Sequence, residues 1–413
     1  MNRYKKIILN NGIPLYLCVD PTMKKVFVSY NLKYGSSGEW FNYNYNGKDY
    51  HVIAGHAHYL EHLLGEHSQF GNIYKEFGRR FQTANAFTGM NETSFLFFGK
   101  DDIEKSIEEL IIAIETPVFE QKDVDETRHA IEEEAATYID NNEKLLNGLN
   151  QRNLYNGFEL IDKTLSRIGN RETTRKITID GLYDCYNAFY SDNNKYIVIG
   201  GNVDEQRIVD LLNNIYSKIT PHKSNLVLPE LDYDSIRKKG EIINGDLDTP
   251  KVGLGMKFKK DDSVLLKELY YALYLIRNSF LESKELRDSG KKGLYDIIDF
   301  SYMTIVNDYI NYSFGFSSKY KDTLINNVLE LLSKRTISKE EYELAQKGLI
   351  AARLRSMENK YKHLMVFPNR VHYTEDYSEC EFYQSVDYNR FMEIVSSLDF
   401  SNWTVNEVKR LKK

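Results

Sequence analysis

The segment HAHYLEHLL, residues 56–64, places polar side chains inside a run that otherwise has the pattern of an apolar helix. His58 and His62 are four residues apart, so a helix presents both imidazoles on one face, as two ligands of one metal ion require. Glu61 lies on the adjoining surface, within reach of a water molecule at the metal without being a ligand. The pattern H-x-x-E-H is the inverted form of H-E-x-x-H, and it predicts a Zn²⁺ site on this helix.

A catalytic zinc site takes three protein ligands and keeps one position open, so a third ligand is required. The helix predicted over about 123–140 contains ETRHAIEEEA, in which Glu126 and Glu133 are two turns apart and share a face. A carboxylate at Glu133 would complete a His-His-Glu set. Glu126 would then hydrogen-bond a ligand histidine and orient its ring. The alternative is an acidic, solvated helix face, because charge runs of this kind are common on helix surfaces.

The two halves of the chain have a similar order of predicted strands and helices, and the elements that carry these residues lie in the first half. The segment 217–233, with Pro221 and Pro229, lacks helical periodicity and divides the chain near its middle. Each half gives the order strand, helix, strand, helix, helix, which favours an internal duplication. Residues 57–62 lie over 272–277 at an offset of 215, as between Ala57 and Ala272. The apolar positions match, whereas the polar ones do not: His58 falls on Leu273, Glu61 on Ile276 and His62 on Arg277. This pattern predicts chemistry in the first half only.

Composition narrows the class of protein. The chain has 413 residues, 42% of them hydrophobic and 28% charged, which is the balance of a globular protein. The net charge of −6 argues against nucleic-acid binding. No apolar run approaches the length of a membrane span, and the three cysteines show no CxxC spacing. We expect a cytoplasmic protein with no membrane contact.

At the quoted residues the chain resembles the inverted-motif zinc peptidases of the pitrilysin family, peptidase family M16. The resemblance rests on GHAHYLEHLL, then TANAFTGMNETSF, then ETRHAIEEE, and it extends over nearly the whole chain. The combination of H-x-x-E-H, N-A-x-T and a distal E-x6-E is more specific than any one of these patterns. It implies an α+β fold of two homologous domains, each an antiparallel sheet packed against helices. The boundaries expected here are 1–220 for the zinc-binding domain, 221–232 for a linker and 233–413 for the second domain.

The resemblance also implies roles for single residues. It makes His58 and His62 zinc ligands, Glu61 the general base and Glu133 the third ligand, with Glu126 in a supporting role. The gap from His62 to Glu133 is a few residues shorter than in well-known members, so Glu132 or Glu134 remains an alternative ligand. Asn85 and Ala86 match the edge strand on which the family pairs the substrate backbone, a form of recognition by strand addition.

One departure from the family concerns partners. Short members carry an arginine and a tyrosine in the second domain, in a pattern like R-L-x-x-x-L-R-E-x-x-G-L-x-Y. Here Phe280 or Leu281 stands where the arginine is expected, and Gly293-Leu294 is followed at once by Tyr295 and Asp296. The departure suggests a heterodimer with a zinc-less homologous subunit, and a homodimer is the alternative. The activity implied is zinc-dependent cleavage of unstructured peptides, with leader-peptide processing as one use. The competing class is a non-enzymatic or partner-dependent subunit of such a complex.

Overall fold

The chain forms two compact units, each assembled from three segments. The first unit comprises Met1–Thr137, Glu159–Glu230 and Asn359–Tyr377, and the second Tyr138–Phe158, Leu231–Glu358 and Ser378–Lys413. The computed structural model describes residues 4–39, 41–139, 141–156, 169–230, 232–245, 247, 249–281, 297–317, 322, 325–326, 329–330, 337–366 and 379–410. Within those residues, no helix is both long and apolar enough to cross a membrane.

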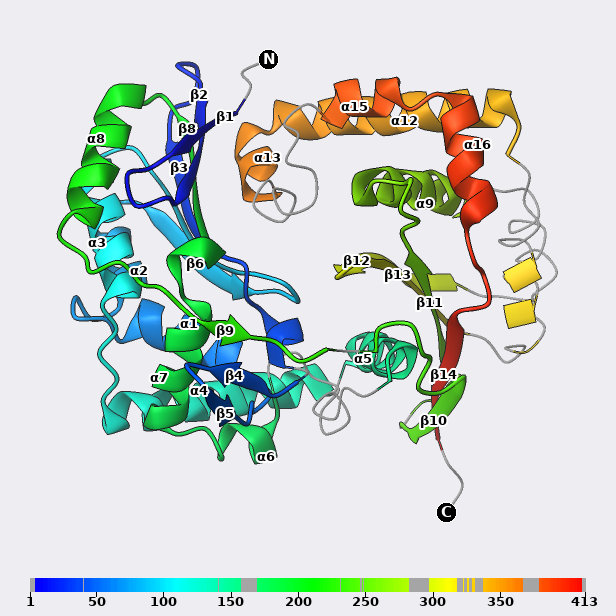
Figure 1. Ribbon diagram of the computed structural model, residues 1–413, viewed down its shortest axis with the longest axis horizontal. Coiled ribbons are helices and arrows are strands. Elements are labelled where there is room, and N and C mark those ends of the chain that lie inside the picture. The colour runs from blue at the N-terminus through cyan, green and yellow to red at the C-terminus, as the bar shows by residue number, and fades with distance from the viewer. Residues whose placement is uncertain are drawn as a thin grey trace. The chain divides into compact units, whose positions relative to one another are not determined.

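A six-stranded sheet forms the centre of the first unit (Figure 1), in the order β1-β2-β8-β3-β7-β6. Neighbours run antiparallel except for β2 and β8, which are parallel. Strands β1 and β2 form a hairpin, and Gly12, at φ 90°, supplies the left-handed residue of its turn. The strands are β1 (Lys5–Ile8), β2 (Pro14–Val19), β3 (Val26–Leu32), β6 (Thr83–Thr88), β7 (Thr93–Gly99) and β8 (Lys195–Gly201).

Helices cover one face of this sheet, and the main core of the unit lies between them. Apolar side chains of β3, β7 and β8 pack there against α1, α3, α7 and α8. The helices are α1 (His56–Glu66), α2 (Ile73–Arg79), α3 (Ile103–Glu115), α4 (Gln121–Ile139), α6 (Arg171–Thr174), α7 (Ile179–Phe189) and α8 (Glu205–Tyr216). A small sheet in the order β5-β4-β9 lies apart from the large one. Its strands are β4 (Tyr43–Tyr45), β5 (Lys48–Tyr50) and β9 (Leu226–Val227).

The opposite face of the first sheet receives a helix from the far end of the chain. Leu364, on α13 (Lys360–Val366), joins a second apolar cluster with Phe27 and Tyr196. Gly200 lies directly beneath it, and a Cβ at that position would come within 2.5 Å of the leucine side chain. The backbone N–H of Lys25 donates to the Tyr361 hydroxyl at 2.8 Å. Helix α13 therefore belongs to the first unit, although it follows most of the second unit in sequence.

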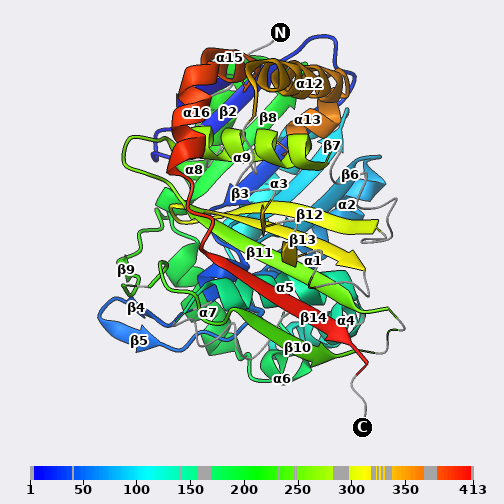
Figure 2. The ribbon, with the colours of Figure 1, turned by 90° about the vertical axis from the view of Figure 1, so that its right-hand side faces the viewer.

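The second unit repeats the strand arrangement with five strands (Figure 2), in the order β10-β14-β11-β13-β12. Again one pair is parallel, β10 with β14, and the others are antiparallel. Its strands are β10 (Gly240–Asn244), β11 (Lys251–Lys259), β12 (Ile297–Val306), β13 (Tyr309–Ser317) and β14 (Trp403–Lys409). Its helices are α5 (Asn142–Leu154), α9 (Leu266–Leu281), α12 (Lys339–Glu358), α15 (Glu379–Ser385) and α16 (Tyr388–Ser397).

Helix α5 packs on the second sheet, against β11, β13 and β14. The glycines of KVGLGMKF have their explanation here, because a Cβ on Gly253 or Gly255 would come within 3.0 Å of the Asn150 side chain. The Asn150 amide donates to the Ser313 hydroxyl at 3.0 Å and accepts from Asn406 at 2.8 Å. A fully buried asparagine is thus satisfied by two strands of the sheet on which its helix lies.

The α+β prediction with sheets packed against helices is confirmed, with the refinement that each of the two large sheets contains one parallel pair. The predicted boundaries, 1–220 and 233–413, take no account of the exchanged segments that carry α5 and α13. The strand expected in KVFVSYNLKYG, residues 25–35, is present as β3, and the helices expected in IEKSIEELIIAI, residues 103–114, and over about 123–140 are present as α3 and α4. Strand β12 and helix α5 were not anticipated. The helix expected in TLINNVLELLS, residues 323–333, lies largely outside the described residues, as do Gly293, Leu294, Tyr295 and Asp296.

Candidate metal centre

Helix α1 separates packing residues from polar ones. Five apolar side chains face the core and are at most 1% exposed; they are Ala57, Tyr59, Leu60, Leu63 and Leu64. Their spacing is that of a helix with one buried face. His58 and Glu61 are nonetheless also buried, at 5% and 8% exposure. Buried polar groups of this kind require partners, and those partners come from other elements.

The two histidines converge on one carboxylate. His58 Nε2 and His62 Nε2 lie 3.3 Å apart. Glu134 Oε2 lies 3.4 Å from His58 Nε2 and 3.8 Å from His62 Nε2. Two imidazole nitrogens and a carboxylate oxygen are donors that Zn²⁺ takes at about 2.0–2.2 Å, and tetrahedral placement at that distance separates ligands by roughly 3.4 Å. The donor types and their separations therefore fit a zinc ion.

Only one of the three adjacent glutamates of α4 takes part. Successive helix residues turn by about 100°, so the three side chains point in different directions. Glu133, the expected ligand, is exposed and does not belong to the group of donor atoms formed by His58, His62 and Glu134. The geometry therefore favours Glu134, one of the alternatives left open by the sequence, over Glu133.

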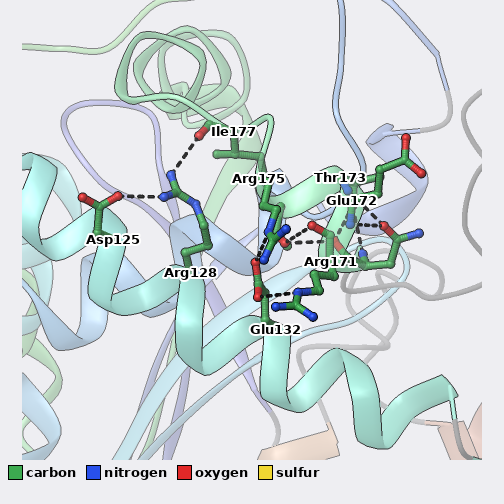
Figure 3. A network of polar contacts seen from close by, with 10 residues as sticks. Asp125, Arg128, Glu132, Arg171, Glu172, Thr173, Arg175 and Ile177 are labelled. Carbon is green, nitrogen blue, oxygen red and sulfur yellow. Dashed lines mark hydrogen bonds and ion pairs between the residues drawn. The ribbon is translucent and has the colours of Figure 1, made fainter.

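Glu132 is committed elsewhere, as Figure 3 shows. Its carboxylate forms ion pairs with Arg171 at 3.2 Å and Arg175 at 3.0 Å, both from the α6 region. Further polar contacts lie one turn earlier on α4. There the Arg128 guanidinium donates to Asp125 at 2.7 Å and to the carbonyl of Ile177 at 3.4 Å. These contacts fix the rotation of α4 about its axis, and Glu134, two residues after Glu132, lies beside the histidines.

Glu66 fixes the orientation of the His62 ring. His62 Nδ1 lies 2.9 Å from Glu66 Oε1, and a hydrogen on Nδ1 leaves the Nε2 lone pair free to bind a metal. Burial lowers the pKa of His62, but without a metal the hydrogen bonds to the carboxylates of Glu134 and Glu66 outweigh that effect and raise it to about 10. A zinc ion that binds Nε2 therefore displaces the proton there. Burial and the neighbouring imidazole of His62 lower the pKa of His58 to about 4.

Glu61 extends from the same helix toward β6. The Thr88 hydroxyl, at the end of that strand, donates to Glu61 Oε2 at 2.7 Å. Burial raises the pKa of Glu61 to about 7, against the opposing effect of the Thr88 hydrogen bond. A carboxyl group with a pKa near neutrality is able both to take up and to release a proton, as a general base that later acts as an acid must do.

Glu126 is not part of this group. Its side chain is 56% exposed and lies 3.7 Å from Lys122. It belongs instead to a second cluster with His67 and Asp123, in which His67 Nδ1 is 3.1 Å from Asp123 Oδ1. This contact joins the C-terminal end of α1 to the first turn of α4. The expected supporting role of Glu126 at a ligand histidine therefore has no counterpart among the described contacts.

Asn85 and Ala86 lie on β6, the last strand of the first sheet as described. They pair with Leu96 and Phe95 of β7, and Asn85 is exposed. A strand in this position offers its free backbone groups to an added strand. Thr88, which contacts Glu61, lies on the same strand, three residues after Asn85 and two after Ala86.

Sequence reasoning missed three residues that the structure brings to the helix. Glu66 follows His62 by four residues, and that spacing alone would have found it. Thr88 is the final residue of the N-A-x-T pattern, which drew attention to Asn85 and Ala86 only. The third, Glu39, contacts the N-terminus of α1 from a distant loop, and no spacing rule relates the two.

The comparisons agree with this architecture. The sequence profile described as Insulinase (Peptidase family M16) matches residues 48–166, which include the motif helix and α4. The profile described as Peptidase M16 inactive domain matches residues 176–349. An uncharacterized zinc protease of Bacillus subtilis strain 168, YmfH, is 27% identical over 368 residues, covering 84% of this chain and 82% of that protein.

Solved structures show the same fold. An M16-like peptidase from Alicyclobacillus acidocaldarius superposes with a TM-score of 0.86 at 19% identity, covering 98% of both chains. Pitrilysin gives a TM-score of 0.73 at 16% identity, covering 98% of this chain and 45% of pitrilysin. The fold is thus that of the two-domain peptidases related to pitrilysin. The chain belongs to peptidase family M16.

Proposed function

We propose that this protein is a zinc-dependent endopeptidase that cleaves unstructured peptides. The observation that carries the proposal is the convergence of His58, His62 and Glu134 beside a buried Glu61. A structural metal site needs no adjacent carboxylic acid, so the presence of Glu61 favours catalysis over a purely structural site. The ligands are His58, His62 and Glu134, with Glu134 taking the place expected for Glu133.

The protein's own groups divide the work of hydrolysis. When bound, Zn²⁺ polarises the scissile carbonyl and lowers the pKa of the attacking water. Glu61 takes a proton from that water and delivers it to the leaving amine. Thr88 orients the Glu61 carboxylate through its 2.7 Å hydrogen bond. Glu66 keeps the His62 ring in the tautomer whose Nε2 carries the lone pair.

The substrate would bind as an added strand along β6. Asn85 and Ala86 are placed to pair with its backbone, and main-chain hydrogen bonds require an extended peptide. Such pairing is compatible with unstructured peptides and excludes segments held in helices. Processing of leader peptides in the cytoplasm is one setting that suits these requirements.

A comparison of wild type with Glu61→Gln tests the proposal. Both proteins are loaded with zinc, their metal content is measured, and each is incubated with a mixed library of unstructured peptides, with and without a chelator. We expect chelator-sensitive cleavage by wild type, no cleavage by the variant and one zinc per chain in both. Cleavage by Glu61→Gln at the wild-type rate would exclude Glu61 as the base.

The second candidate is a subunit that needs a partner. The match of residues 176–349 to a domain described as inactive, together with the departure at Phe280 and Leu281, favours it. In this case the chain pairs with a zinc-less homologous subunit, or with a second copy of itself. Binding of one zinc without cleavage of any peptide is the result that would support it.

A further inference from the structure

Helix α1 begins without a cap of its own. Its N-cap is Gly55, at φ 108°, and its first turn contains no acidic residue. The first N–H groups of a helix have no partner within the helix, and a buried start requires acceptors from elsewhere. Glu39 supplies them: its Oε2 accepts from the backbone N–H of Gly55 at 2.7 Å, and its Oε1 accepts from that of Ala57. One carboxylate therefore binds two N–H groups at the start of the helix that carries the histidines.

The two bonds restrict how the helix is set. Two hydrogen bonds to one carboxylate restrain the start of α1 more than a single one would, in addition to the packing of its apolar face. His58 is the residue directly after Ala57, so any shift of the helix start moves its imidazole. The groups that must meet α1 lie on other elements, Glu134 on α4 and Thr88 on β6. Their alignment with the helix thus depends on where its N-terminus is held.

Glu39 is itself fixed to the strand edge. It ends η1 (Ser36–Glu39) and is 2% exposed. The backbone N–H groups of Ser36 and Ser37 donate to the carbonyls of Gly89 and Met90, at 3.1 and 2.8 Å. Those two carbonyls belong to the turn that follows β6. The short segment therefore links the end of β6, with Thr88, to the start of α1.

We propose that Glu39 is a positioning residue for the metal centre. It sets α1 so that His58 and His62 meet Glu134 while Glu61 meets Thr88. The inference rests on the proposed function, since it assigns Glu39 a role toward the zinc ligands.

The test measures zinc affinity directly, by competition with a chelator, in wild type, Glu39→Gln and Glu39→Asp. Glutamine keeps the shape but turns an NH₂ group toward one of the two donors, whereas aspartate keeps the carboxylate on a shorter stem. Glu115→Gln is the matched control. Glu115 is also buried and also accepts two hydrogen bonds, from Tyr30 at 2.8 Å and Lys195 at 2.6 Å, neither of which lies on α1.

We expect Glu39→Gln to bind zinc about tenfold more weakly than wild type, within the range found when groups behind metal ligands are removed. Glu39→Asp should fall between the two, and Glu115→Gln should keep wild-type affinity even if its thermal stability drops. Wild-type affinity in folded Glu39→Gln, or an equal loss in Glu115→Gln, would overturn the inference. If the glutamine variant does not fold, Glu39→Asp decides the question. The inference would be overturned if that variant had wild-type zinc affinity and an unchanged rate of amide hydrogen exchange at Ala57.

Failure of the proposed function gives a different result. If the wild-type chain binds zinc but cleaves no peptide, the zinc affinities of wild type, Glu39→Asp and Glu39→Gln can still be compared. That comparison decides the role of Glu39. A wild-type chain that binds no zinc removes the metal centre, and the inference falls with it. The affinity and cleavage measurements therefore separate the two claims.

Discussion

The first and second units have the same strand topology but differ in the helix that precedes the edge strand. In the first, α1 lies between β3 and β6 in the chain, and in the second, α9 lies between β11 and β12. The parallel pair occupies the corresponding place in both sheets, β2 with β8 and β10 with β14. The scaffold is common to the two units, whereas the donor group formed by His58, His62 and Glu134 lies in the first unit, on α1 and α4.

The packing positions show what the scaffold needs. Ala57 and Ala272 are both 0% exposed, and Leu60 and Leu275 are 0% and 1% exposed. The matched polar positions diverge: Leu273 and Ile276 are buried apolar residues, and the Arg277 guanidinium lies 4.7 Å from the centre of the Tyr274 ring. An apolar residue serves the fold at these places without any partner. Packing therefore does not require the histidines and glutamate of α1.

The largest expected effect comes from Glu134, the proposed third ligand. Glu134→Gln should weaken zinc binding by at least about 100-fold, because loss of a ligand exceeds the loss of a group behind one. Glu133→Gln, one residue away and exposed, should leave the affinity unchanged. Zinc affinity is measured by chelator competition in both variants. Loss of zinc in Glu133→Gln and retention in Glu134→Gln would restore Glu133 as the ligand.

Ile276→Ala, the change at the position matching Glu61, tests the second unit. Removal of a buried isoleucine side chain should cost about 2–4 kcal/mol of unfolding free energy, from lost burial and a residual cavity. Zinc affinity should not change. Glu61→Ala should cost much less stability, because it removes a buried carboxyl group and not a packing residue. Urea denaturation of both variants gives the comparison, and equal costs would contradict it.

Thr88→Val tests the hydrogen bond that β6 provides to the Glu61 carboxylate. Valine keeps the shape of threonine but cannot donate to Glu61, so kcat/KM should fall by about tenfold through misorientation of the base. Thr88→Ser, which keeps the hydroxyl, should retain most of the activity. Zinc content should be unchanged in both. A serine variant as impaired as the valine variant would show that the methyl group, and not the hydrogen bond, is what matters.

The smallest effects concern two glycines in the two units. Gly255→Ala places a Cβ 3.0 Å from that of Asn150 and should destabilise the protein by about 1 kcal/mol through overpacking. Gly78→Ala, on α2, meets nothing within 4 Å and should stabilise by about 0.5–1 kcal/mol through helix propensity. Thermal unfolding measures both. Changes of the same sign would remove the packing explanation for Gly255.

The sequence was informative where local spacing decides the outcome. His58 and His62 are brought together by one helical turn, and the apolar pattern of α1 fixes which face is buried. The choice among Glu132, Glu133 and Glu134 could not be made in the same way, because a shift of one residue turns a side chain by about 100°. It depends on the phase of α4, which the ion pairs of Glu132 with Arg171 and Arg175 help to set. Contacts made across the fold, such as Glu39 with Ala57, leave no trace in spacing.

The exchanged helices limit how this chain could be divided. The segment carrying α5 precedes the linker at 221–232 but belongs to the second unit, and α13 follows it but belongs to the first. A gene split at the linker would leave α5 in the first polypeptide without the second sheet, on which it packs. It would leave α13 in the second polypeptide without the first sheet. Asn150 would lose Ser313 and Asn406, and Gly200 would be left without Leu364. Two such fragments would need each other to fold, so their separate evolution as independent proteins would first require both helices to be replaced.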